Sequence, residues 1–258
     1  MAHAMESGHW YRADSGEPCY QVPNASKPGE FRNTTLKDAK KLGLVPSVTT
    51  VQGILEKPQL IRWKVKQAIL ASLTMPRPSG MSDDDYLDAL IDDANRQSID
   101  AMGLGTKVHA AIQGAYEGEL WLPEMEVYCF ATMNAITKEF GNKKWICEKS
   151  FAHPLGFGGK CDMYSEDRTI LVDFKTTQSN GEKLKKVRNP EHLLQLSAYR
   201  LGLGLERASL ANVYISTTVP GEVYIKNWTE DQALQGTKEW IALLNYWKIS
   251  KKFMLPEG

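Results

Sequence analysis

Asp162, Asp173 and Lys175 have the residue types and the spacing for metal and acid–base chemistry. In the segment TILVDFKTT, strand alternation places Leu171, Asp173 and Lys175 on one face and Ile170, Val172 and Phe174 on the other. If the preceding segment, GGKCDMYSE, pairs with it as a hairpin, Asp162 meets Asp173 at one end of a sheet. Two adjacent carboxylates repel each other unless a cation lies between them, and hard oxygen ligands suit Mg²⁺ or Mn²⁺. An ion there would polarise a phosphate oxygen and activate a water, while Lys175 would stabilise developing charge or orient that water.

An ordinary structural role is the alternative for these residues. The D-x-K pattern is common by chance, and on its own it favours an exposed hairpin carrying a simple Asp–Lys pair. The upstream GGKCD segment, Gly158 to Asp162, lies at a distance that fits a pairing strand and shifts the balance toward a functional site.

Four motifs in a fixed order resemble the PD-(D/E)xK nuclease superfamily and, within it, the RecB-like exonuclease branch. They are GTKVH at Gly105–His109, GGKCD at Gly158–Asp162, DFKTT from Asp173, and QLSAY at Gln195–Tyr199. The resemblance covers residues 105–215 well. PSVTT followed by LIRW, nearer the N-terminus, is also similar to the phage-encoded and mitochondrial genome-maintenance exonucleases of this branch. The proline of the superfamily's name is absent before Asp162, as is common in the branch.

The resemblance implies a role for each matching residue. The metal ligands would be His109, Asp162, Asp173 and the backbone carbonyl of Phe174, and Lys175 would be the catalytic lysine. Gln195 and Tyr199 lie four residues apart on one helix face and would border the active site and the DNA strand. Ordinary helix packing is their alternative role, above all for Tyr199.

Two further residues have competing interpretations. A histidine such as His109 is more often structural than a ligand, but the accompanying motifs favour the ligand role. Glu148 would share a strand face with Ile146 and Ser150, and it either reaches the site or pairs with neighbouring cations and solvent.

Two basic segments are candidates for nucleic-acid contact. The first, in the helix expected over Pro58–Leu73, contains Arg62, Trp63, Lys64 and Lys66; the second contains Lys183, Lys185, Lys186 and Arg188. An indole can stack on a base, and lysines can hold phosphates. The alternative is that Trp63 is a core residue and the cations form a solvated face.

Composition and charge place few limits on the partner. The chain has 258 residues, 42% of them hydrophobic and 24% charged, which excludes disordered, coiled-coil and collagen-like classes, and no apolar run is long enough to span a membrane. The 31 basic and 31 acidic residues cancel, but the acidic excess is concentrated in residues 81–126. The neutral total therefore leaves a DNA partner open. We expect DNA to follow the flanking basic segments, with the acidic face over residues 83–100 turned away.

Periodicity and turn residues predict the elements that must position these groups. The sequence predicts a hairpin over His9–Val22 and then six helices: Thr35–Leu42, Pro46–Leu55, Pro58–Leu73, Ser82–Met102 with a stop at Gly103, a new helix from Gly105 capped by Thr106, and Pro123–Phe140. Three strands follow, in the segments KWICEKSFA, GGKCDMYSE and TILVDFKTT. The chain then continues with a helix over Pro190–Leu203, strands in ASLANVYIST and EVYIKNW, and a closing helix over Glu230–Lys252. This order predicts an α/β (α+β) fold with a central mixed sheet flanked by helices, which the resemblance makes restriction-endonuclease-like. We expect an N-terminal hairpin and helical region, 1–104, packed on a nuclease core, 105–258, as one compact unit.

Together these features predict a DNA exonuclease that uses one or two Mg²⁺ or Mn²⁺ ions. By resemblance it acts on single-stranded DNA or duplex ends in replication, recombination or repair, in the cytoplasm of a phage-infected bacterium, with a single-strand annealing or replication protein as a partner. A non-catalytic DNA-binding or recombination protein on the same fold is one alternative. A structure-specific endonuclease or RNA nuclease with the same chemistry is the other.

Overall fold

The computed structural model describes residues 9–187 and 189–254, which form two compact units. One unit combines Met1–Ile54 with Ala111–Gly258, and the other is Leu55–Ala110. The division at residue 104 expected from the sequence stays a prediction. Within the described residues, no helix has the length and apolar character needed to cross a bilayer.

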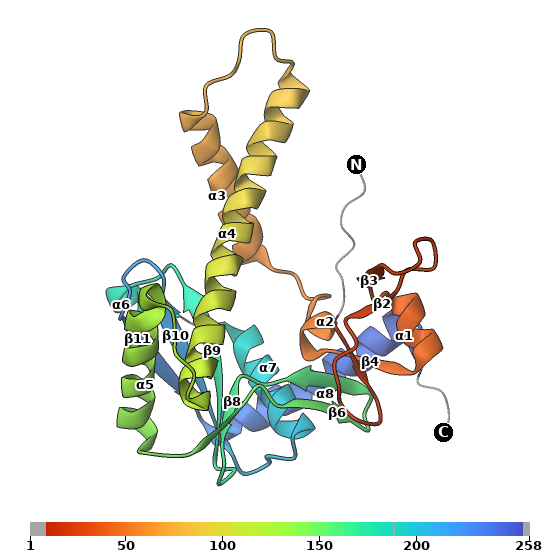
Figure 1. Cartoon of the computed structure of the whole chain (residues 1–258), viewed down its shortest axis with the longest axis vertical. Helices are drawn as coiled ribbons and strands as arrows, with labels where there is room; N and C mark the ends of the chain where they lie inside the picture. Colours follow the sequence, from red (N-terminus) through yellow and green to blue (C-terminus); the bar gives the residue numbers. More distant parts are fainter. Residues whose placement is uncertain (1–8, 188, 255–258) are drawn as a thin grey trace. The chain divides into compact units, whose positions relative to one another are not determined.

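A five-stranded mixed sheet, in the order β11-β10-β9-β8-β5, is the centre of the first unit (Figure 1). Its strands are β5 (Trp145–Cys147), β8 (Met163–Ser165), β9 (Ile170–Thr177), β10 (Ser209–Ser216) and β11 (Val223–Trp228). Strands β9 and β10 are parallel, and the other neighbours are antiparallel. Helix α5 (Glu126–Phe140) packs on β10 and β11 and follows the short helix η1 (Pro123–Met125). Helix α7 (Pro190–Gly202) packs on β9 and β10, and α8 (Glu230–Ser250) packs against α7. The predicted fold class, a mixed sheet flanked by helices, is confirmed.

The two parallel strands form the middle of the core. Leu171, Val172 and Val213 have no exposed surface, so both faces of the strand pair are covered. Central strands covered on both faces are normally apolar throughout. Asp173, Asn212 and Ser216 are buried polar residues in these strands, at 1%, 0% and 0% exposure, and each therefore requires a partner.

The two arms of the hairpin expected over His9–Val22 do meet, through an antiparallel bridge between Tyr11 and Pro18 and through backbone hydrogen bonds in which Arg12 N–H donates to Glu17 and Cys19 N–H donates to Trp10. Each arm also pairs with a further strand, which gives two small sheets. Strand β1 (Trp10–Arg12) pairs with β4 (Leu44–Pro46), and β2 (Gln21–Pro23) pairs with β3 (Phe31–Asn33). The pairing of β1 with β4 was not predicted because the two strands are distant in sequence, whereas β3 lies close to β2 in sequence and was not predicted as a strand. Pairing with β4 buries both aromatic side chains of β1, which a lone two-stranded hairpin would leave exposed.

Both short N-terminal helices form within the expected ranges, Thr35–Leu42 and Pro46–Leu55, and each begins at a capping residue. Helix α1 (Leu36–Leu42) begins at a Thr35 capping box and ends at Gly43, which takes the left-handed conformation at φ 64°. Helix α2 (Val48–Gln52) follows Ser47, whose hydroxyl accepts a hydrogen bond from a backbone N–H of the first turn.

The second unit contains α3 (Pro58–Thr74) and most of α4 (Asp83–Glu117). The predicted stop at Gly103 and restart at Gly105 are wrong, because α4 runs through both glycines. A glycine costs a helix only about 1 kcal/mol relative to alanine, which a long helix tolerates. Thr106 is not a cap: its hydroxyl donates to the Met102 carbonyl one turn earlier, at 3.1 Å.

Two of the three expected strands in the second half are interrupted. KWICEKSFA divides into β5 and β6 (Ser150–His153), and GGKCDMYSE divides into β7 (Phe157–Lys160) and β8, with β6 and β7 forming a separate sheet. Glu148 lies at the first break with φ 52°, and its N–H donates to the Asp162 carbonyl at the second break, at 2.9 Å. The shared strand face expected for Ile146, Glu148 and Ser150 is therefore wrong.

Candidate active site

The β8–β9 hairpin brings the two predicted carboxylates to the same place. Met163 pairs with Val172, so the register continued by one residue sets Asp162 beside Asp173. The backbone N–H of Phe174 donates to the Asp162 carboxylate at 2.6 Å, which ties the end of one strand to the middle of the other. The hairpin and its juxtaposed carboxylates are confirmed.

Asp173 and Lys175 form a close ion pair on this hairpin. The Lys175 ammonium lies 2.9 Å from Oδ1 and 2.7 Å from Oδ2 of Asp173. The Asp173 side chain is 1% exposed and that of Lys175 is 22% exposed, so the pair is shielded from water on the aspartate side and open on the lysine side. A buried carboxylate of this kind is stable when an opposite charge and hydrogen bonds compensate it.

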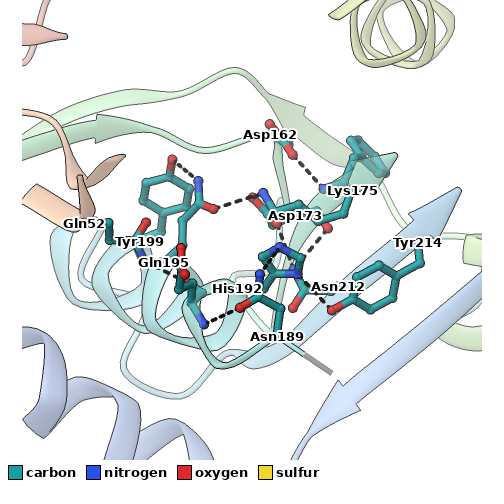
Figure 2. Close-up of polar contacts among 12 residues, drawn as sticks. Gln52, Asp162, Asp173, Lys175, Asn189, His192, Gln195, Tyr199, Asn212 and Tyr214 are labelled. Atoms are coloured by element: carbon teal, nitrogen blue, oxygen red, sulfur yellow. Dashed lines mark hydrogen bonds and ion pairs between the residues drawn. The ribbon is translucent and has the colours of Figure 1, made fainter. Parts of the chain in front are cut away.

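Helix α7 supplies the next members of the site. Gln195 Oε1 accepts a hydrogen bond from Lys175 at 2.9 Å, and its Nε2 donates to the Tyr199 hydroxyl at 2.8 Å. Figure 2 shows Gln195 between Tyr199 and the Asp173–Lys175 pair. Burial raises the pKa of Tyr199 well above its ordinary value, so this hydroxyl stays protonated. Gln195 therefore contacts Lys175 directly, whereas Tyr199 acts on it only through Gln195.

The carboxyl group of Asp162 is strongly perturbed by burial. Burial raises its pKa to about 6, although the Lys175 ammonium and the Phe174 N–H favour the charged form. Glu148 adds a further negative charge nearby, while forming its own ion pair with Lys160. A carboxyl that is costly to ionise gains most from a neighbouring cation.

The sequence did not identify the groups that support Asp173 and Lys175 from β10 and β11. Asn212 lies opposite Asp173 in the parallel register and donates to its Oδ2 at 2.8 Å, and Trp228 donates to Asn212 Oδ1 at 2.8 Å. An asparagine inside the apolar run ASLANVYIST was the available signal. Its partner could not be inferred, because the β9–β10 pairing is not local.

His192 is a second residue that the sequence did not identify, and it contacts the strand neighbour of Lys175. His192 Nδ1 is 3.0 Å from the hydroxyl of Tyr214, the register partner of Lys175, and Asn189 contacts the other ring nitrogen at 3.1 Å. Burial, together with the Lys175 charge, lowers the pKa of His192 to about 3. The imidazole is therefore neutral at physiological pH and adds no positive charge to the site.

The start of α7 is attached to the N-terminal region. The Gln52 amide, in α2, donates to the Glu191 carbonyl in the first turn of α7 at 2.8 Å (Figure 2). This contact helps fix the helix that carries Gln195.

The remaining predicted residues have different placements. Lys183 and Lys185 lie on α6 (Gly181–Lys185) and Lys186 follows it; all three are exposed, and Lys185 pairs with Glu182 at 2.7 Å. Arg188 is outside the described residues. Arg62, Trp63, Lys64 and Lys66 lie on α3 in the second unit, with the cations exposed and Trp63 partly buried. His109 is on α4 in the second unit, and its metal-binding role stays a prediction.

The chemistry of the donor set fits a divalent cation. Asp162, Asp173 and the Phe174 carbonyl are hard oxygen donors, and Mg²⁺ is usually held by one or two carboxylates together with waters and substrate phosphates. Across residues 9–187 and 189–254, no three His, Cys, Asp or Glu side chains are grouped so as to hold a metal ion. The donors that the first unit brings together are therefore the two carboxylates and the Phe174 carbonyl.

Comparisons with known proteins found similar proteins among solved structures. No family model matches the sequence, and no curated protein matches it. Among solved structures, the alkaline exonuclease LHK-Exo from Laribacter hongkongensis is similar at 16% identity and a TM-score of 0.36, over 74% of this chain and 94% of that one. The same enzyme in complex with dAMP is similar at 14% identity and a TM-score of 0.34, over 74% and 93% of the two chains. A protein called SSO0001 is similar at 15% identity and a TM-score of 0.30, over 72% and 86%. These likenesses are weak, and the proposal below rests on the site.

Proposed function

We propose that this protein is a metal-dependent DNA exonuclease of the PD-(D/E)xK type, and more narrowly of its RecB-like branch. The observation that carries the proposal is the meeting of Asp162, Asp173 and Lys175 at one end of the β8–β9 hairpin, with Gln195 on Lys175. These side chains come from three motifs that are separate in the sequence. Simple core packing does not require two carboxylates and an ammonium to be gathered in one partly buried place.

The reaction would be hydrolysis of a phosphodiester bond. Asp162, Asp173 and the Phe174 carbonyl would hold Mg²⁺ or Mn²⁺, with His109 as a further proposed ligand. When bound, the ion polarises a phosphoryl oxygen and lowers the pKa of a water molecule. In the hydrolysis, the water would lose a proton to solvent as its oxygen bonds to phosphorus, the bond to the leaving sugar oxygen would break, and that oxygen would take up a proton from solvent.

Lys175 has two tasks in this scheme. Its ammonium lies at the exposed side of the pair, where it can stabilise the negative charge that develops on the phosphoryl group. Its hydrogen bond to Gln195 limits the directions in which the side chain can point. A preorganised donor of this kind contributes more than a mobile one, because it needs no rearrangement during the reaction.

The substrate would be DNA, single-stranded or at duplex ends. The exposed lysines of α6 follow the C-terminal end of β9, the strand that carries Lys175, and can contact the phosphates beside the scissile bond. A role in recombination or repair, a phage origin, a cytoplasmic location and an annealing or replication partner remain predictions from the sequence.

Digestion of end-labelled linear DNA and of circular single strands, with and without Mg²⁺, tests the proposal. We expect Mg²⁺-dependent release of nucleotides from the linear strand and none from the circle. Cleavage of the circle would indicate an endonuclease, and cleavage of RNA alone would indicate an RNA nuclease. DNA binding without any Mg²⁺-dependent product would contradict the catalytic proposal and favour a non-catalytic binding protein.

A further inference from the structure

The amide of Asn212 is held in one orientation between β9 and β11. It lies directly opposite Asp173 in the parallel β9–β10 register and diagonally across from Trp228 in the antiparallel β10–β11 pair. An indole N–H can only donate, so the Asn212 oxygen must accept it, and the NH₂ group is left facing Asp173. Trp228 therefore determines that the NH₂ group of Asn212, and not its oxygen, faces the Asp173 carboxylate.

The contact with Asp173 is specific to one carboxylate oxygen. Asn212 Nδ2 lies 2.8 Å from Oδ2, and the Asn212 side chain is fully buried. Lys175 approaches both oxygens of the same carboxylate from the more exposed side. With donors on both sides, rotation of the carboxylate about its bond to the chain breaks at least one hydrogen bond of a side chain that is only 1% exposed.

We propose that Asn212, oriented by Trp228, is a positioning residue that aims the Asp173 carboxylate for metal binding. This inference rests on the proposed function and deepens it. Ligating carboxylates are usually hydrogen-bonded by neighbouring groups that set their direction, and loss of such a partner typically costs about 10–100-fold in metal affinity or activity. Asn212 does not reach the substrate in this scheme, and its effect passes through Asp173.

The test is Mn²⁺ binding by calorimetry without DNA, for the wild type, Asn212→Ala and Trp228→Phe. Asn212→Ala removes the donor, whereas Trp228→Phe keeps an aromatic ring and removes the N–H that orients the amide. Asn227→Ala is the matched control, because Asn227 is an exposed asparagine on β11 that donates to Glu139 and lies outside the site. We expect Asn212→Ala to raise the Kd for Mn²⁺ by about 10-fold or more. Trp228→Phe should give a smaller loss in the same direction, and Asn227→Ala should give none.

Kinetics on DNA provide the second readout. A positioning role predicts that kcat falls while KM for DNA is retained, with partial recovery of kcat at high Mn²⁺. If Asn212→Ala fails to fold, Trp228→Phe alone decides the question. If the folded variants bind Mn²⁺ with the same Kd as the wild type, and the wild type cleaves DNA, this inference is overturned and the proposed function stands. A wild type that neither binds Mn²⁺ nor cleaves DNA would overturn both.

Discussion

The ammonium of Lys175 lies 2.9 Å from Gln195 Oε1, which links the D-x-K strand to helix α7 across 20 residues of sequence. Because Gln195 Nε2 donates to Tyr199, its oxygen must be the atom that faces the lysine. The orientation of Lys175 thus depends on a helix side chain as well as on Asp173.

Replacing Gln195 should therefore affect catalysis through the direction of Lys175. Gln195→Ala removes the acceptor, and we expect kcat to fall by about 10–100-fold with a much smaller change in thermal stability. Tyr199→Phe, which removes only the outer hydroxyl, should have a smaller effect. Steady-state kinetics on single-stranded DNA measures both, with Gln235→Ala as the control, since Gln235 is an exposed residue of α8 that donates to Glu239. Equal kcat values for Gln195→Ala and the control would contradict this role.

The lysines of α6 should contribute to the salt dependence of DNA binding. For Lys183→Ala with Lys186→Ala, we expect weaker binding and a shallower slope of log K against log salt, by about 0.7 for each phosphate of a single strand that the variant no longer neutralises. Fluorescence anisotropy across a salt series, without divalent cations, measures the slope. Lys238→Ala with Lys251→Ala, two exposed lysines at α8, removes the same charge elsewhere on the unit. The same slope in both double variants would exclude a specific role for α6.

The first glycine of the GGKCD motif should be required for packing. A Cβ on Gly158 would lie 2.8 Å from the Phe151 carbonyl oxygen and 2.9 Å from Tyr11 Cβ, so backbone would have to move. Gly158→Ala should lower the free energy of unfolding by about 1–3 kcal/mol. Gly103→Ala is the opposite control, because a Cβ there meets open space on helix α4 and should stabilise by about 0.5–1 kcal/mol. Urea unfolding compares the two variants. An unchanged free energy of unfolding for Gly158→Ala would show that β7 and β1 are less tightly packed than the close contacts indicate.

His192 should make the protein less stable in mild acid. Its folded-state pKa is lowered to about 3 while the unfolded value is about 6.5, so between these values the unfolded chain binds a proton that the folded chain does not. The free energy of unfolding attributable to this group is therefore largest above pH 6.5 and falls as the pH falls toward 3. His192→Gln loses this titration. We expect its stability deficit relative to the wild type to shrink by about 2 kcal/mol between pH 7.5 and pH 5. An unchanged deficit in urea unfolding would show that the histidine titrates normally.

The sequence was most informative where structure is local. The hairpin that joins Asp162 to Asp173 and the short helices over Leu36–Leu42 and Val48–Gln52 depend on neighbouring residues, and all were predicted. Helix α7 was also predicted, and with it the shared face of Gln195 and Tyr199, because helical spacing alone decides that contact.

The sequence was least informative where distant segments meet or a local signal is overruled. Nothing local indicates that β10 lies parallel to β9, so the Asn212–Asp173 and His192–Tyr214 contacts were not predicted. Glycines that look like helix stops are tolerated inside α4, where the surrounding turns outweigh their cost. The left-handed conformation of Glu148 interrupts an otherwise regular strand, and a glutamate carries no sequence signal for that backbone.

The most direct test of the proposed site compares two Asp–Lys pairs in the same part of the fold. Asp173 and Lys175 form the proposed catalytic pair, whereas Asp167 and Lys143 form a surface pair 2.5 Å apart beside the turn of the same hairpin. We would measure the initial rate of Mg²⁺-dependent nucleotide release from end-labelled DNA for Asp173→Asn, Lys175→Met, Asp167→Asn and Lys143→Met. The account predicts that the first two lose about a hundredfold or more in rate and that the last two stay near the wild type. Wild-type rates in Asp173→Asn or Lys175→Met, with both proteins folded, would contradict it.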